Sequence, residues 1–386
     1  MDNFWQQIPR PIIGLSPMDG VTDASFRYIT AKHGKPDVML TEFVNIQSAM
    51  YAPDIMIKDF TYAEIERPIA AQIYGKTPEL FYKVAHIVGE LGFDGLDINM
   101  GCPAKKVAAA GCGAALIRTP ELAREIIRAA RHGIEDWANG QTLEQIGIRP
   151  SAIAAFKAAN RLRTGSDDAP KRRIIPLSVK TRIGYERNAI DEWIPNLLEE
   201  RPAAITLHGR TLQQGYKGDA DWHAIARAAQ HAKGSSTLVL GNGDLRDMPD
   251  IYRRISETGV DGVLMGRAAE GNPWLFAGKG EVKQALCGNG IVGPQPAIGL
   301  ADRFEVIREH SEHYQSVVQL RSFVGMRKHL IWYCLDFRGA AEMRSRMVRL
   351  SSAAEVDRCL QDFLTEGMNN SMHCGEATSA AAFASI

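Results

Sequence analysis

Short runs of aliphatic and β-branched residues alternate with helix-like stretches along residues 11–265. Eight of these runs are strand candidates, at residues 11–18, 38–43, 69–74, 95–100, 177–183, 204–208, 238–240 and 262–265. This alternation favours parallel strands joined by crossover helices, and eight such units predict an α/β fold of the (β/α)8 TIM-barrel type. The alternative is a doubly wound open sheet, which usually has fewer strands and a glycine-rich turn after the first one, a turn that this chain lacks.

Helical patterns fill the connections between these strands, at residues 23–33, 79–91, 121–131, 191–200, 222–231 and 248–258. Thr77-Pro78 and Thr119-Pro120 place a proline in the first turn of two of these helices, where proline is well tolerated. Pro176 is expected to open the fifth strand, because proline is poorly tolerated inside a paired strand.

Domain boundaries are expected where this alternation stops. Residues 1–278 are predicted to form the barrel, with an insertion at about 134–173 that is too long for an ordinary loop and contains a helix candidate at 151–162. Residues 300–368 show only helical patterns and are predicted to form a second, helical domain at the C-terminal end. Residues 369–386 are small and polar without periodicity, and we expect a disordered tail there.

Composition argues against several classes of protein. Lys and Arg together number 45, as do Asp and Glu, so only a local basic face, and no global charge, could attract nucleic acid. The six cysteines show no CxxC spacing, which argues against a disulfide scaffold and a zinc site, and no metal is expected. No apolar run approaches ~20 residues and no secretory signal is visible, so we expect a cytoplasmic protein without membrane association.

Polar residues gather where the predicted strands end. They are Pro17, Met18 and Asp19 at the end of the first strand, Gln72 in the third, Asp97, Asn99 and Cys102 at the end of the fourth, Lys180 and Arg182 in the fifth, His208 and Arg210 at the end of the sixth, Asn242 and Asp244 after the seventh, and Gly266 and Arg267 after the eighth. Because TIM-barrel active sites lie at the carboxyl ends of the strands, this pattern predicts a polar pocket at that mouth.

Three features of this set indicate chemistry, and each also has a plain structural interpretation. The glycines of 241–244 and Gly266-Arg267 could bind a phosphate, or could simply form turns. Lys180 could pair with an anionic reduced flavin or form a Schiff base, or could extend its ammonium to solvent. Cys102 could be a nucleophile, an acid or a redox group, or a small buried hydrophobe, whereas Cys112 is interpreted as packing.

Several segments in this order resemble the tRNA-dihydrouridine synthases. They are SPMDGVTDASFR at 16–27, AAQIYG at 70–75, LDINMGCPAKKV at 96–107, GCGAAL at 111–116, VKTRIG at 179–184, TLHGRT at 206–211, LGNGD at 240–244 and MGRAAEGNPW at 265–274. The similarity runs from about residue 11 to about residue 350. It implies an FMN-containing barrel followed by a helical RNA-binding domain. It also implies NADPH-dependent reduction of the carbon 5–carbon 6 double bond of particular uridines in tRNA.

The resemblance also implies a role for each residue that matches the family's motifs. Backbone of Pro17, Met18 and Asp19 would contact the flavin, and Gln72, Lys180 and His208 would contact its ring. Asn242, Gly243, Asp244, Gly266 and Arg267 would hold its phosphate and ribityl chain. Asn99 would face the uracil, Arg182 and Arg210 would lie near the substrate, and Cys102 would be the proton donor.

A basic stretch in the predicted helical domain is a candidate for tRNA binding. Its cations are Arg321, Arg327, Lys328, Arg338, Arg344, Arg346 and Arg349, with Trp332 and Tyr333 between them. Arg327 and Lys328 are the expected contacts, and the insertion's Lys171, Arg172 and Arg173 are the second choice. Two other functions stay open: an FMN barrel oxidoreductase acting on a free small molecule, as dihydroorotate dehydrogenases do, or a flavin-free RNA-binding barrel. A monomer is expected.

Overall fold

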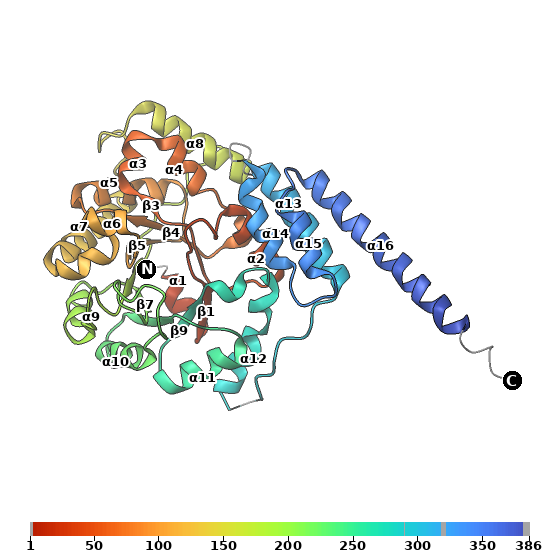
Figure 1. Ribbon diagram of the computed structural model, residues 1–386. Helices are drawn as coiled ribbons and strands as arrows, with labels where there is room; N and C mark the ends of the chain where they lie inside the picture. The colour runs from red at the N-terminus through yellow and green to blue at the C-terminus, as the bar shows by residue number, and fades with distance from the viewer. Residues whose placement is uncertain (1–2, 289, 318–321, 381–386) are drawn as a thin grey trace. The chain divides into compact units, whose positions relative to one another are not determined.

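The computed structural model describes residues 3–288, 290–317 and 322–380 (Figure 1). The chain forms two compact units. One contains residues 1–269 and 273–295, and the other contains residues 270–272 and 296–386. The first unit is the barrel, and the second contains helices and no strand among its described residues.

Eight parallel strands close into a ring, which confirms the predicted TIM barrel. The strands are β1 (Ile12–Leu15), β2 (Met39–Leu40), β4 (Ile69–Tyr74), β5 (Gly95–Met100), β6 (Leu177–Arg182), β7 (Ala204–His208), β8 (Leu238–Asn242) and β9 (Gly262–Met265). Each pairs in parallel with its neighbours, β2 pairs with β4, and β1 pairs with β9 to complete the ring.

The second predicted strand, residues 38–43, is broken in the structure. β2 covers only Met39–Leu40, and a further short strand, β3 (Val44–Asn45), pairs with the carboxyl end of β4. At the break, the Thr41 hydroxyl accepts a hydrogen bond from the backbone N–H of Gln72, with 3.0 Å between oxygen and nitrogen. A side-chain oxygen therefore takes the place of a backbone carbonyl as the hydrogen-bond acceptor for β4 at this point. Residue periodicity does not predict this exchange.

Helices fill the connections around the ring (Figure 1). They are α2 (Ala24–His33), α3 (Ile46–Tyr51), α4 (Pro53–Asp59), α5 (Pro78–Glu90), α6 (Lys105–Ala109), α7 (Pro120–Ala138), α8 (Pro150–Thr164), α9 (Ile190–Leu198), α10 (Trp222–Ala232), α11 (Met248–Thr258) and α12 (Lys279–Leu286). α5 and α7 begin at the predicted prolines, and Asp23, Asp221 and Asp247 cap α2, α10 and α11 by accepting backbone N–H bonds. α12 lies where the sequence predicts only a connection.

Alternation along the strands divides the apolar residues into two layers. An inner cluster contains Ile12, Val38, Leu40, Ala70, Ala204, Leu238, Leu240 and Leu264. Phe4 and Trp5 of α1 (Phe4–Gln7) join this cluster and fill the amino-terminal end of the barrel. The next inward positions along β4, β7 and β8 are Gln72, Thr206 with His208, and Asn242, so the same strand face that is apolar at one end is polar at the other.

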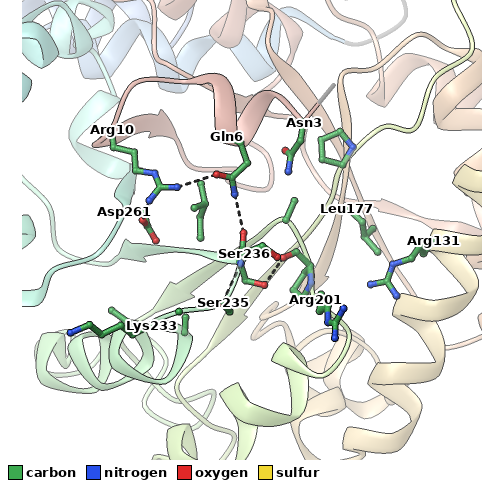
Figure 2. A pocket seen from close by; sticks show the side chains of 18 of the residues that line it. Asn3, Gln6, Arg10, Arg131, Leu177, Arg201, Lys233, Ser235, Ser236 and Asp261 are labelled. Carbon is green, nitrogen blue, oxygen red and sulfur yellow. Dashed lines mark hydrogen bonds and ion pairs between the residues drawn. The ribbon is translucent and has the colours of Figure 1, made fainter. Parts of the chain in front are cut away.

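An open cavity of about 890 Å³ lies at the amino-terminal end, between α1 and the starts of β6, β7 and β8 (Figure 2). Arg10 donates hydrogen bonds to Asp261 at 2.7 Å and to Gln6 at 3.0 Å, and Gln6 donates to the Ser236 carbonyl at 2.9 Å. These bonds connect α1 to the loops before β8 and β9. This end of a TIM barrel generally contributes stability, and the predicted site residues lie at the other end.

The predicted insertion is attached to the barrel by its own cations. α7 runs five residues into it and α8 supplies the predicted helix. Arg163 donates to the Leu91 carbonyl at 3.2 Å, Arg172 forms an ion pair with Glu90 of α5 at 3.8 Å, and Arg173 donates to Asp94 at 2.9 Å. Two of the three cations at 171–173 therefore bind the barrel itself, which leaves Lys171 as the exposed one.

The second unit contains α13 (Leu300–Val317), α14 (Arg327–Tyr333), α15 (Ala340–Met347) and α16 (Ala353–Ala380). Phe304, Phe337 and Phe363 form a triangle of rings whose centroids are 5.8–6.1 Å apart. α16 continues to Ala380, past residue 369, where the sequence predicts the end of regular structure. No proline follows Pro296, so the backbone can continue its helical hydrogen bonds, and residues 381–386 lie outside the described residues. Among the described helices, none is long and apolar enough to cross a bilayer.

Candidate active site

Every site residue predicted in the barrel lies at the carboxyl end of the ring, and side-chain contacts join most of them. Asn99 bonds Gln72, Lys180 bonds Asn242, Arg182 bonds His208, and Asp244 bonds both Arg210 and Arg267. Strand register explains the closeness, since Asn99 pairs with Lys180, Arg182 with His208, and His208 with Asn242. Arg327 and Lys328 belong to the helical unit.

A buried chain of hydrogen bonds leads to the loop that carries Cys102. Gln72 Nε2 donates to Asp97 at 2.7 Å, and Asn99 Nδ2 donates to Gln72 Oε1 at 2.9 Å. The side-chain oxygen of Asn99, Oδ1, accepts hydrogen bonds from the backbone N–H groups of Gly101 at 3.0 Å and Cys102 at 2.8 Å. Asn99 therefore fixes the backbone at Cys102.

Cys102 keeps its proton at neutral pH. Its side chain is buried, and this burial raises the pKa of the thiol above 9.0. The carboxylate of Asp19 acts in the same direction, while the backbone N–H of Ala104 and the charges of Arg182 and Lys180 act against it. A thiol in these surroundings suits an acid rather than a thiolate nucleophile.

Lys180 and His208 lie on β6 and β7 at the same carboxyl mouth, and the charge of Lys180 acts on this thiol. Lys180 Nζ donates to Asn242 Oδ1 at 3.2 Å, and burial followed by repulsion from Arg182 lowers its pKa to about 8. Burial and the charges of Lys180, Arg182, Arg210 and Arg267 lower the pKa of His208 to about 2, so the imidazole is neutral. Its Nδ1 lies 3.2 Å from Arg182 Nη1, which can only donate, so the proton of the ring is assigned to Nε2.

Cations and glycines gather after β7, β8 and β9. Asp244 accepts hydrogen bonds from Arg210 at 2.6 Å, from Arg267 at 2.9 Å and from the backbone N–H of Ala220 at 2.8 Å. Burial acts to raise the pKa of this carboxyl group, but these donors and their charges hold it below 3.8. Arg210 is buried, and its Nη1 has no hydrogen-bond partner among the described residues. This arrangement leaves positive charge directed at one end of the site.

Two glycines are required here by space or backbone shape. Gly243 has φ of +125°, and a Cβ on it would lie 2.8 Å from the Ala220 Cβ. A Cβ on Gly266 would lie 3.1 Å from the Met18 sulfur. The turn at Pro17–Asp19 is held by Thr22, whose hydroxyl accepts the Met18 N–H at 2.9 Å. Backbone N–H groups can thus approach a ligand closely at this mouth.

Sequence reasoning gave no role to Asp97, Ser178 and Thr41, which support the residues that it did choose. Gln72, Asp97 and Ser178 are register partners across β4, β5 and β6. The available signal was the run of polar residues at alternate, inward positions in three neighbouring strands. That signal becomes a contact only once the strand register is known.

A family model described as Dihydrouridine synthase (Dus) matches residues 14–166 and 167–368. The chain belongs to the dihydrouridine synthase family. A relative named "Probable tRNA-dihydrouridine synthase 2", from Bacillus subtilis (strain 168), is 32% identical over 94% of this chain and 97% of that protein. A "Probable tRNA-dihydrouridine synthase" from Staphylococcus aureus (strain MRSA252) is 30% identical over 94% of this chain and 96% of that protein.

A comparison with solved structures found lower similarity than these two sequence relatives show. Ligand-free DHODH from Eimeria tenella is 17% identical, covers 67% of this chain and 70% of its own, and has a TM-score of 0.39. A likeness this weak supports no conclusion about the site or its ligands. The family assignment therefore rests on the family model and on the two sequence relatives.

Proposed function

We propose that the protein is a tRNA-dihydrouridine synthase, a flavin-dependent oxidoreductase that reduces the carbon 5–carbon 6 double bond of specific uridines in tRNA. FMN is the proposed cofactor and NADPH the proposed reductant, and the protein is proposed to act as a cytoplasmic monomer. Family membership and the printed names of the relatives support the substrate class. The observation that carries the reaction is a buried thiol at Cys102, with a pKa raised by burial, at the same carboxyl mouth of the barrel as Lys180 and neutral His208.

The residues at this mouth fit a phosphate-bearing cofactor. The buried Nη1 of Arg210 lacks a partner among the described residues, and Arg267 is 61% exposed beside it on Asp244. Gly243 and Gly266 sit where a side chain would clash, so backbone N–H groups are open to an anion. These four residues, with Asn242 and Asp244, are the proposed holders of the FMN phosphate and ribityl chain, while Gln72, Lys180 and His208 are the proposed contacts of its ring.

A bound flavin would supply the hydride for carbon 6 of the uracil. The chain's own residues handle the proton and the position of the substrate. Cys102 Sγ holds the proton that carbon 5 receives, and Asn99 fixes the backbone at Cys102 while its free N–H can meet the uracil edge. The positive charges of Lys180 and Arg182 stabilise negative charge that develops nearby. Arg182 and Arg210 are the proposed neighbours of the substrate.

The test is a reconstituted reaction with unmodified tRNA. The purified protein is denatured and its flavin is identified by chromatography, with FMN expected over FAD. NADPH oxidation is then measured with tRNA, with free uridine and with orotate, and dihydrouridine is quantified by mass spectrometry of tRNA digests. Dihydrouridine formed only with tRNA is the expected result. Turnover of a free small molecule, or protein that purifies colourless, would contradict the proposal.

A further inference from the structure

Asp97 is a buried carboxyl group to which the proposed reaction assigns no part. It is 1% exposed, lies on β5 between Gln72 and Ser178, and accepts from Ser178 Oγ at 2.6 Å and from Gln72 Nε2 at 2.7 Å. Burial raises its pKa to about 6, with the hydrogen bonds and Lys180 acting in the other direction. Placing an ionised carboxylate in such a site is costly, so its chemistry needs an explanation.

The hydrogen-bond chain has a fixed direction at both ends. An ionised carboxylate can only accept, so the Gln72 amide must turn its NH2 group toward Asp97. Its oxygen then faces Asn99, which must present its own NH2 group. At the far end the backbone N–H groups of Gly101 and Cys102 can only donate, and they meet the remaining Asn99 oxygen.

We propose that Asp97 is a positioning residue that sets the orientation of the Gln72 and Asn99 amides and thereby fixes the backbone that carries Cys102. Without an acceptor-only group at position 97, the Gln72 amide could flip and place its NH2 group against that of Asn99. Asn99 would then lose its partner or turn its NH2 group toward the N–H groups of Gly101 and Cys102. The inference rests on the proposed function for the role of Cys102, but the orientation itself does not depend on it.

Ser178 makes the proposal sharply testable, because a hydroxyl can donate or accept. In Asp97→Asn, the introduced amide can keep its oxygen toward Gln72 and give its NH2 group to Ser178. In Ser178→Ala, the carboxylate remains an acceptor for Gln72. Only the double variant lacks both the acceptor-only carboxylate and the Ser178 hydroxyl. The NH2 group of the introduced amide then has Gln72 as its acceptor, and the direction of the hydrogen-bond chain reverses.

The experiment is a double-variant cycle on the flavin-loaded protein, with Asp97→Leu as a fourth variant. Alkylation of Cys102 by iodoacetamide is followed by peptide mass spectrometry, with exposed Cys287 as the internal standard. kcat and KM for tRNA, flavin content and thermal stability are measured alongside. Asp94→Asn is the matched control, because Asp94 accepts hydrogen bonds at the opposite end of the same strand.

Each single variant should stay within about threefold of the wild type in kcat and in the rate of Cys102 alkylation. The double variant and Asp97→Leu should lose about tenfold or more in kcat, with KM changed less, because misplacing an acid is costly. Their Cys102 should be alkylated several-fold faster. Additive effects in the cycle, or an Asp97→Leu protein with wild-type alkylation, would overturn the proposal. If the wild type makes no dihydrouridine, the proposed function fails, while the alkylation rates still decide the orientation.

Discussion

Cys102 experiences opposing influences, and their balance decides what chemistry its sulfur can perform. Burial and Asp19 favour the thiol, whereas Lys180 and Arg182 favour the thiolate, and burial dominates. Cys112, ten residues later, is also buried, but its thiol donates to the carbonyl of Ala110 at 3.7 Å and the charge that acts on it is that of Lys76. The two cysteines therefore differ in their neighbours more than in their exposure.

Cys102→Ala should retain its flavin and its NADPH-driven flavin reduction but lose dihydrouridine formation. Removal of a general acid typically costs ~10²–10⁴-fold in rate. Single-turnover reactions of the pre-reduced enzyme with tRNA measure this step directly. Cys112→Ala is the matched control and should be nearly neutral, and wild-type turnover by Cys102→Ala would exclude the acid role.

Asp97 should make stability depend on pH in a definite direction. Its pKa rises from 3.8 to about 6 on folding, so the folded protein binds this proton more tightly, and the stability from this group is lost as pH rises through 6. Between about pH 4.5 and about pH 7 the loss is about 2 kcal/mol at about 1.4 kcal/mol per pH unit. The groups facing Asp97 are Gln72, Ser178 and Lys180, and only Lys180, with its pKa near 8, titrates close to this range.

The free energy of unfolding of Asp97→Asn, minus that of the wild type, should therefore increase by about 2 kcal/mol as pH rises from about 4.5 to about 7. Urea unfolding at several pH values measures the difference in free energy of unfolding. A difference that does not change with pH would show that Asp97 does not titrate in this range. Asp94→Asn again serves as the comparison.

At the level of elements, the sequence predicted strands and helices correctly where a local residue pattern is typical of a single type of structure. Aliphatic and β-branched runs alternating with helical stretches, together with the prolines of α5 and α7, predicted the eight-stranded ring and most of its helices. The broken second strand was missed, because Thr41 bonds the backbone of β4 through its side chain. Support by Asp97 was missed as well, because strand register is a property of the folded sheet.

Lys180 within β6 and Arg267 after β9 should act on the cofactor in different ways. Arg267→Ala removes a charge at the phosphate end and should lower the flavin content of purified protein. Lys180→Ala should leave more flavin bound but shift its absorption spectrum and reduction potential, because Lys180 is proposed to contact the ring. Flavin content and potentiometric titration measure the two effects. Full, spectrally unchanged flavin in both variants would reverse or exclude the proposed orientation of FMN.

Across the whole molecule, acidic and basic residues are equal in number. The basic side chains nevertheless differ, because some bond other residues of the protein and others are exposed. In the helical unit, Arg327 donates to the Leu350 carbonyl at 2.8 Å, Arg344 to the Cys334 carbonyl at 2.6 Å, and Arg346 to Glu366 at 2.7 Å. Arg338 and Arg349 are exposed, and Arg321 lies outside the described residues. Arg327 and Lys328 remain predicted tRNA contacts, but the bonds of Arg327 also give it a structural role.

Arg349→Glu should raise KM for tRNA and leave NADPH-driven flavin reduction unchanged. Removing one bound phosphate should flatten the dependence of log affinity on log salt by ~0.7–0.9. tRNA binding across a salt series measures this slope. Arg327→Ala is the comparison and should lower the melting temperature, because it removes the donors to Leu350 and Ser351. An unchanged slope in Arg349→Glu would assign that arginine to solvent.

The pairing of β1 with β9 has a consequence for biosynthesis. Ile12–Leu15 pairs with β2 on one side and with Gly262–Met265 on the other, so a nascent chain that ends before residue 262 has two open sheet edges and no complete mouth. The proposed cofactor ligands span Pro17 to Arg267, almost the same interval. Flavin can therefore load only after the last strand has been synthesised and has docked, and retained colour reports that the ring has closed.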